Sequence, residues 1–187
     1  GGNGYEAAAF LIEQFKDTSL KAADDKNHGL DLDAMALEYA NKYKTYKAEQ
    51  KAIGNLEYAK VPCINHPIFK GKDVNFDPRE EFVGKLFEGK GINNVFLDYY
   101  HSIVNALFKT KVSKNVYCVN IDAVIAVILL KMVWSEYKAG EMVEADIETA
   151  SFATFLFGRM IGCAAEIDDH TFRGKNMDTR TPASKCS

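Results

Sequence analysis

Residues 120–134, NIDAVIAVILLKMVW, decide the expected fold. On a helix, the apolar side chains from Ile121 to Trp134 occupy nearly every side, which is typical of a helix that other helices surround. The run from Ile121 to Leu130 is apolar apart from Asp122 and ends at Lys131 after 10 residues, whereas a membrane span needs roughly 20. We therefore predict a central core helix and no membrane span.

Helical periodicity continues on both sides of this segment, so we predict an all-α fold. Asp77-Pro78 is a typical helix start, because Asp caps the helix and Pro fits its first position. We expect the Tyr stripe of residues 31–53 to pack in the core, and residues 17–29 and 60–76 to form loops. The expected helices cover residues 5–15, 31–53, 77–89, 96–108, 121–138 and a last one that opens at Glu141 and runs through Met160.

Composition limits the class of protein. The 187 residues, 47% of them hydrophobic, suit one domain or a large piece of one and exclude a disordered or collagen-like chain. With 23 basic and 26 acidic residues, the net charge of −3 argues against a nucleic-acid partner. The cysteines at 63, 118, 163 and 186 are widely spaced, and three lie in apolar runs. They predict reduced, buried thiols of an intracellular protein.

Two residues have the strongest potential for chemistry. His66 lies in the proline-bounded loop Val61–Pro67, which suits either a hydrogen-bond donor to a substrate or a loop histidine that bonds a nearby carbonyl. Asp122 stands at the start of the central apolar helix, where it is either a helix cap or a carboxylate aimed into a cleft. In a cleft, its pKa could be tuned for a base.

Cationic residues surround these two in the sequence. Arg79 follows Asp77-Pro78, and Arg159 lies in a helix that is expected to be buried, so both need anionic partners. Either a structural ion pair or a carboxylated substrate satisfies them. Lys70 and Lys72 are either solvated or near a phosphate. His170 beside two carboxylates lacks ligand geometry, so we expect no metal site.

These residues belong to motifs that resemble the citrate synthase superfamily, most closely the citrate-synthase-like domain of ATP-citrate lyase. Residues 66–70 followed by 77–79, a His-to-Lys loop and then Asp-Pro-Arg, resemble the citrate synthase loop. Residues 1–9 are similar to the lyase's Gly-Gly helix start, and residues 120–123 and 157–162 are similar to its Asn-Val-Asp-Gly and Leu-Gly-Arg-Ser-Met-Gly segments. Residues 177–182 are similar to its late Arg-His-Pro stretch.

The resemblance covers nearly all of residues 1–187, with a longer insertion at about 17–60 and an extended tail from about 173. It implies an acyltransferase that interconverts acetyl-CoA plus oxaloacetate with citrate. In that family His66 would polarise the oxaloacetate carbonyl and Asp122 would take a methyl proton from acetyl-CoA. The carboxylate clamps would be Arg79, Arg159 and, from a neighbouring subunit, Arg180, and CoA phosphates would lie near Lys70 and Lys72.

The departures from the family imply that this chain alone is not a complete enzyme. Asn65 and Pro67 replace the usual Gly and Arg around His66, and Ala164 is nearest to a position where the family has His. The chain starts at Gly1 without a Met, so we expect an upstream segment or partner chain to supply the rest of the domain.

We accordingly expect a homodimer or higher oligomer in the mitochondria or cytoplasm, with no tightly bound cofactor. The alternatives are a non-catalytic citrate-synthase-like subunit of a larger complex and an unrelated helical bundle.

Overall fold

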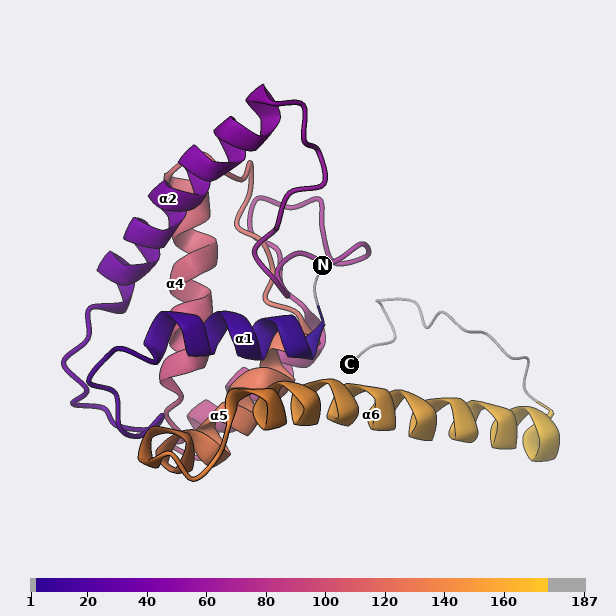
Figure 1. Cartoon of the computed structure of the whole chain (residues 1–187). Helices are drawn as coiled ribbons and strands as arrows, with labels where there is room; N and C mark the ends of the chain where they lie inside the picture. The colour runs from indigo at the N-terminus through magenta and orange to yellow at the C-terminus, as the bar shows by residue number, and fades with distance from the viewer. Residues whose placement is uncertain (1–2, 175–187) are drawn as a thin grey trace.

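The computed structural model describes residues 3–174, and this part of the chain is all helical, which confirms the predicted class. The described residues contain no strand but have two isolated β-bridges, Ile64 with Val119 and Val74 with Val116. Figure 1 shows how the helices are arranged. They are α1 (Gly4–Phe15), α2 (Leu32–Ala52), α3 (Pro78–Gly89), α4 (Val95–Lys109), α5 (Ile121–Ala139) and α6 (Glu144–Arg173).

Short polar side chains begin five of these helices. In each, the side chain accepts a hydrogen bond from a backbone N–H of the first turn, which has no partner within the helix. Asn3 does this as part of a capping box with Glu6, and Gly140 in the left-handed conformation ends α5. The capping residues are Asn3, Asp31, Asp77, Asn94 and Asn120.

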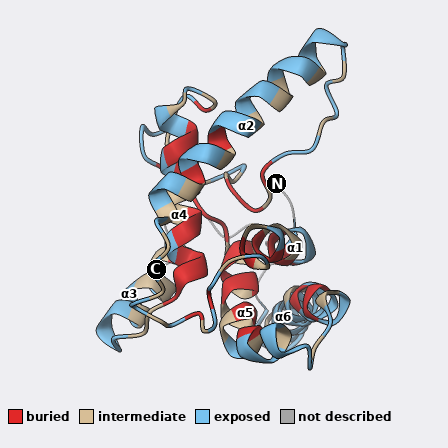
Figure 2. Ribbon diagram, turned by 60° about the vertical axis from the view of Figure 1, so that its left-hand side comes forward, coloured by how far each residue is buried: buried red, intermediate tan, exposed pale blue. Residues whose placement is uncertain are grey.

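The core forms around α5, as the sequence predicts. Helices α1, α3, α4 and α6 all contact α5, and α2 packs on α4. Figure 2 shows the buried residues concentrated in α4, α5 and the inner side of α1. Trp134 on α5 packs edge-on against Phe96 with ring centroids 5.0 Å apart, and its Nε1 donates to the Leu20 carbonyl oxygen at 2.9 Å. The loop after α1 is thereby tied to the core.

The loop that contains His66 is held against the start of α5. The Asn65 N–H donates to the Cys118 carbonyl at 2.7 Å, and the Asn120 N–H donates to the Cys63 carbonyl at 3.0 Å. These two bonds flank the bridge between Ile64 and Val119. Segments about 55 residues apart in the sequence are thereby held together, with His66 two residues after Ile64 and Asp122 three residues after Val119.

Helix α6 differs from its prediction. Its first turns pack on α1 and α5 and bury Ile147 and Ser151. Beyond Ser151 nearly all residues are exposed or half-buried, and the helix projects past the others (Figure 1). The expectation that Arg159 lies in a buried helix is therefore wrong.

A further prediction for α6 is wrong for the same reason. The helix makes no close contact at Gly158 or Gly162, where an added Cβ would meet nothing within 4 Å. Cys163 is exposed, whereas Cys63 and Cys118 are buried free thiols as predicted. Among the helices in residues 3–174, α6 is the one whose length and composition would allow it to cross a membrane. Within α6, 6% of the 18-residue segment that meets this criterion is buried.

Candidate functional site

Asp122 lies in the first turn of α5 but does not cap it. Asn120 is the cap, and its Oδ1 accepts the N–H groups of Asp122 and Ala123. The interpretation of Asp122 as a helix cap is therefore wrong. Its Oδ1 is buried and has no hydrogen-bond partner among the described residues. Desolvation by burial raises the pKa of Asp122, while the positive charges of Arg79 and Arg159 oppose this increase.

Arg79 is held by a carboxylate that the sequence analysis treated only as a helix cap. Asp77 is completely buried, and its two oxygens accept from Arg79 Nε at 2.9 Å and from an Arg79 terminal nitrogen at 2.6 Å. Asp77 Oδ1 also accepts the backbone N–H of Arg79 at 3.0 Å. The bidentate pair fixes the plane of the guanidinium, which lies 5.8 Å from the ring centroid of Phe69.

The imidazole of His66 is oriented by its own loop. Its Nδ1 accepts the backbone N–H groups of Ile68 at 3.1 Å and Phe69 at 3.4 Å, and its ring stacks on Phe69 with centroids 4.5 Å apart. A neutral imidazole whose Nδ1 is an acceptor carries its proton on Nε2. Desolvation lowers the pKa of His66 and favours this neutral form. His66 can therefore donate one hydrogen bond through Nε2.

The backbone before His66 has a conformation that glycine usually supplies. Asn65 has φ 65°, in the left-handed region that Asn adopts more readily than most residues. Its Oδ1 accepts the His66 N–H at 2.9 Å. Asn65 therefore provides the turn that a Gly would provide, and adds a hydrogen bond that a Gly lacks.

A common electrostatic environment links these residues. The charges of Arg79, Arg159 and Asp77 all act on the pKa of Asp122, and those of Asp77 and Arg79 act on the pKa of His66. Arg159 is on the exposed part of α6, with its guanidinium 5.1 Å from the ring centroid of Phe155. Asp122 is thus within electrostatic range of Arg79, Arg159 and Asp77, and His66 is within range of Asp77 and Arg79.

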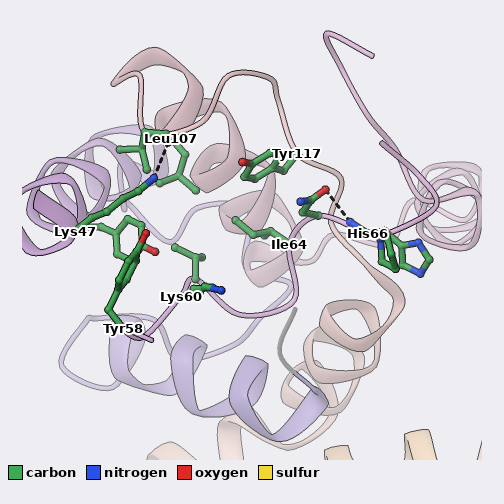
Figure 3. Close-up of a pocket in the computed structure, with 12 residues that line it drawn as sticks. Lys47, Tyr58, Lys60, Ile64, His66, Leu107 and Tyr117 are labelled. Atoms are coloured by element: carbon green, nitrogen blue, oxygen red, sulfur yellow. Dashed lines mark hydrogen bonds between the residues drawn. The ribbon is translucent and has the colours of Figure 1, made fainter. Parts of the chain in front are cut away.

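A pocket of about 430 Å³ opens beside the His66 loop. Figure 3 shows Lys47 and Tyr58 on one side of it and His66 at the opposite edge. Lys47 donates to the Val112 carbonyl at 3.1 Å, and burial raises the pKa of Tyr43 to about 12. The ammonium groups of this pocket attract an anionic ligand, and its aromatic side chains can pack against a planar part of that ligand. Its lining includes Tyr43, Lys47, Tyr58, Lys60, Asn65, His66 and Tyr117.

The other predicted binding residues lie elsewhere. Lys70 and Lys72 line a separate pocket of about 260 Å³ with Phe69 and Phe76, and Lys72 Nζ lies 5.2 Å from the centroid of the Phe76 ring. Arg180 lies outside the described residues. Within residues 3–174 no group of three His, Cys, Asp or Glu side chains could hold a metal ion.

Comparison with known proteins gives no relative. No protein-family model, no curated protein and no solved structure matches the chain. The geometry of the site therefore carries the functional interpretation.

Sequence reasoning missed two residues of this site. Asp77 was assigned to capping, although the run Asp-Pro-Arg places a second donor two residues after the carboxylate. Phe69 was not singled out, although its ring contacts both His66 and Arg79. An aromatic residue three positions after a loop histidine was the available indication of this stacking.

Proposed function

We propose that this chain contributes the base and substrate-positioning groups of a citrate synthase or ATP-citrate lyase type of acyltransferase. The reaction interconverts acetyl-CoA plus oxaloacetate with citrate through citryl-CoA, and an upstream segment or partner chain completes the site. One observation carries the proposal. Asp122 combines a buried oxygen without a partner in the described region, a raised pKa and the nearby charges of two arginines.

In the condensation, Asp122 takes a proton from the acetyl methyl group. The C–H electron pair forms an enolate, whose carbon attacks the oxaloacetate carbonyl. The resulting alkoxide regains, through solvent, the proton that Asp122 took, which gives citryl-CoA. A base with a raised pKa is well matched to this step, because it holds the abstracted proton more readily. The developing enolate oxygen needs a donor, and we assign that donor to the completing segment. Water then cleaves the thioester and releases citrate and CoA.

His66 fits the role of donor to oxaloacetate. Its neutral form is favoured, and the bonds to Nδ1 leave Nε2–H to polarise the carbonyl that is attacked. A neutral donor stabilises the developing alkoxide without adding a charge that would hold the substrate equally well before reaction. The left-handed backbone at Asn65 supports the resemblance, because this departure from the family's Gly conserves the turn.

The carboxylate clamps fit Arg79 and Arg159. Asp77 fixes the plane of Arg79, so the guanidinium loses little freedom when it binds a carboxylate. Oxaloacetate binding to the complete assembly, measured by calorimetry, is expected to weaken about tenfold or more in Arg79→Gln and in Arg159→Gln. Lys85→Gln on the exposed side of α3 is the control and should leave binding unchanged.

The nucleotide end of CoA has two candidate positions. Lys70 and Lys72 were expected from the sequence, and the larger pocket with Lys47 and Lys60 lies on the His66 loop as well. CoA binding by Lys47→Gln/Lys60→Gln and Lys70→Gln/Lys72→Gln double variants separates them, because only one pair should weaken it.

The decisive experiment measures release of the CoA thiol from acetyl-CoA plus oxaloacetate by the complete assembly. Asp122→Ala should abolish release while oxaloacetate binding persists. Unchanged turnover would refute the assignment. An assembly that neither turns over nor binds oxaloacetate would instead support a non-catalytic, citrate-synthase-like subunit.

A further inference from the structure

The pocket of about 430 Å³ beside the His66 loop is built in part from residues to which the resemblance gives no role. Its volume lies within the range of about 300–1,000 Å³ that is usual for sites of small organic ligands. Four of its lining residues come from the insertion at about 17–60, and they are Tyr43, Lys47, Tyr58 and Lys60. The chemistry of the lining therefore has to indicate which ligand the pocket fits.

Hydrogen bonds from α2 hold the walls of this pocket in place. Lys47 on α2 donates to the Val112 carbonyl at 3.1 Å, which ties α2 to the loop after α4. The Tyr46 hydroxyl accepts the Ala59 N–H at 3.3 Å, which holds the segment after α2 against the same helix. A pocket whose walls are fixed before binding loses little conformational entropy when a ligand enters.

The floor of the pocket is apolar and its sides are aromatic. The buried residues of the floor are Val61, Ile64 and Leu107. Tyr58 and Tyr117 lie within electrostatic range of Tyr43, so the three phenol rings gather around one space. Flat apolar faces of this kind pack favourably against a planar ring. The inner part of the pocket therefore suits an aromatic ring system.

The polar side of the pocket is positively charged. Figure 3 shows Lys47, Tyr58 and Lys60 on the same side of it. None of the described residues that line the pocket is Asp or Glu. Within residues 3–174, neither Lys47 nor Lys60 forms an ion pair with a carboxylate, whereas Lys42 on the same helix pairs with Glu38 at 2.6 Å. Two ammonium groups therefore remain available to an anion.

A phosphate monoester balances these two ammonium groups. It carries a charge of about −1.5 to −2 at neutral pH, whereas one carboxylate would leave one ammonium group without a counter-charge. Ammonium groups only donate hydrogen bonds, and the oxygens of a phosphate dianion only accept them. The pocket thus combines a place for a planar ring with a place for a dianion.

We propose that this pocket binds a nucleoside monophosphate, with the base against the apolar floor and the phosphate at Lys47 and Lys60. Stacking on aromatic rings holds a base without a requirement for base-specific hydrogen bonds, and the ammonium groups attract the phosphate. The ligand is either a free nucleotide or the nucleotide end of CoA, which have this chemistry in common. The inference does not depend on Asp122 or on the proposed reaction.

Calorimetry on the full-length chain tests the two parts of the site separately. AMP should bind with a dissociation constant below about 1 mM. Adenosine, which lacks the charge, and inorganic phosphate, which lacks the ring, should each bind at least tenfold more weakly. Absence of saturable AMP binding would overturn the proposal. Phosphate that binds as tightly as AMP would overturn it in favour of a simple anion site, and phthalate that binds more tightly than AMP would do so in favour of a ring dicarboxylate.

Two substitutions assign the contacts. Tyr58→Leu keeps an apolar side chain but removes the ring, and should weaken AMP and adenosine alike by at least about fivefold. Lys60→Gln should weaken AMP at least about threefold and leave adenosine unchanged. Lys44→Gln is the matched control, because Lys44 is exposed on α2 and does not line the pocket. With helical circular dichroism retained, unchanged AMP affinity in Tyr58→Leu and Lys60→Gln would overturn the proposal.

Competition identifies the source of the nucleotide. AMP that CoA displaces, but pantetheine does not, supports the nucleotide end of CoA as the ligand. AMP that stays bound at saturating CoA supports a free nucleotide. Asp122→Ala should bind AMP like the wild-type chain, so a failure of the proposed reaction and a failure of this inference are distinguishable. Loss of AMP binding in Asp122→Ala would overturn the placement of the nucleotide in this pocket.

Discussion

Replacement of Asp77 by Ala tests whether the buried ion pair organises the site. The Asp77 side chain is completely buried and performs two tasks. It caps α3 through the Arg79 N–H and binds the Arg79 guanidinium through both oxygens. Asp77→Ala removes both, and it leaves the guanidinium without its carboxylate.

The expected loss of stability combines these two contributions. A helix cap contributes about 1 kcal/mol. Charge-assisted hydrogen bonds contribute about 1.5–3 kcal/mol each when buried, but 45% of the Arg79 side chain is exposed, so water weakens the pair and can solvate Arg79 after the substitution. We therefore expect Asp77→Ala to lower the free energy of unfolding by about 2–3 kcal/mol.

Urea denaturation followed by the fluorescence of Trp134, the single tryptophan, gives this quantity. Asp31→Ala is the matched control, because Asp31 caps α2 through the Ala34 N–H but is exposed. Its expected cost is about 1 kcal/mol. A double-mutant cycle with Arg79→Ala isolates the side-chain pair. Equal costs for Asp77→Ala and Asp31→Ala, or a coupling energy of zero, would refute the view that the pair holds Arg79 in place.

Three further substitutions have expected outcomes. Gly4→Ala places a Cβ 2.6 Å from Ser151 Oγ, where α1 meets α6, and should destabilise the protein by about 1–3 kcal/mol. Gly158→Ala has open space around it and should stabilise the protein by up to about 1 kcal/mol. Similar effects of the two substitutions in urea denaturation would contradict the close contact between Gly4 and Ser151. Trp134→Phe leaves the Leu20 carbonyl without its donor and should cost about 1–3 kcal/mol, measured by circular dichroism; no loss would mean that water replaces the indole. Asp122→Asn should raise the melting temperature at pH 7, because the raised pKa of Asp122 makes its ionised form unfavourable in the folded state. The gain should vanish below the ordinary pKa of 3.8, where Asp122 is protonated in both the folded and the unfolded protein. A gain in melting temperature that is independent of pH would contradict this origin.

The sequence predicts most of the fold because local physics determines it. Asp77 and Pro78 mark the start of α3 where the structure has it, and the apolar run of α5 indicates the centre of the core. The prediction fails at α6. Its residues 152–172 have the composition of a buried helix, and periodicity reports only that a surface is apolar, not what covers it. The described residues provide no cover for this part of α6.

The candidate site is less accessible to sequence reasoning. Spacing can suggest that Asp122 and Arg159 belong together, but the desolvation of Asp122 depends on the fold of the loop and on α3. The role of Asp77 depends on geometry too, since a cap and a bidentate partner use the same carboxylate. Because Asp77 is buried, its carboxylate both caps α3 and binds the Arg79 guanidinium. This burial depends on the packing of α3 on α5.

The charge balance of the site leads to a further expectation about substrate binding. Within the described region, the charges that act on Asp122 are those of Arg79, Arg159 and Asp77. With Asp122 ionised, these two positive and two negative groups sum to zero. Oxaloacetate adds two negative charges at neutral pH, so this cluster alone cannot balance it. Arg180, which the resemblance assigns to the site and which lies outside the described residues, would balance one of these two charges. Oxaloacetate should therefore bind the complete assembly at least about tenfold more tightly than the isolated chain. Equal affinities would show that the site needs no further cation.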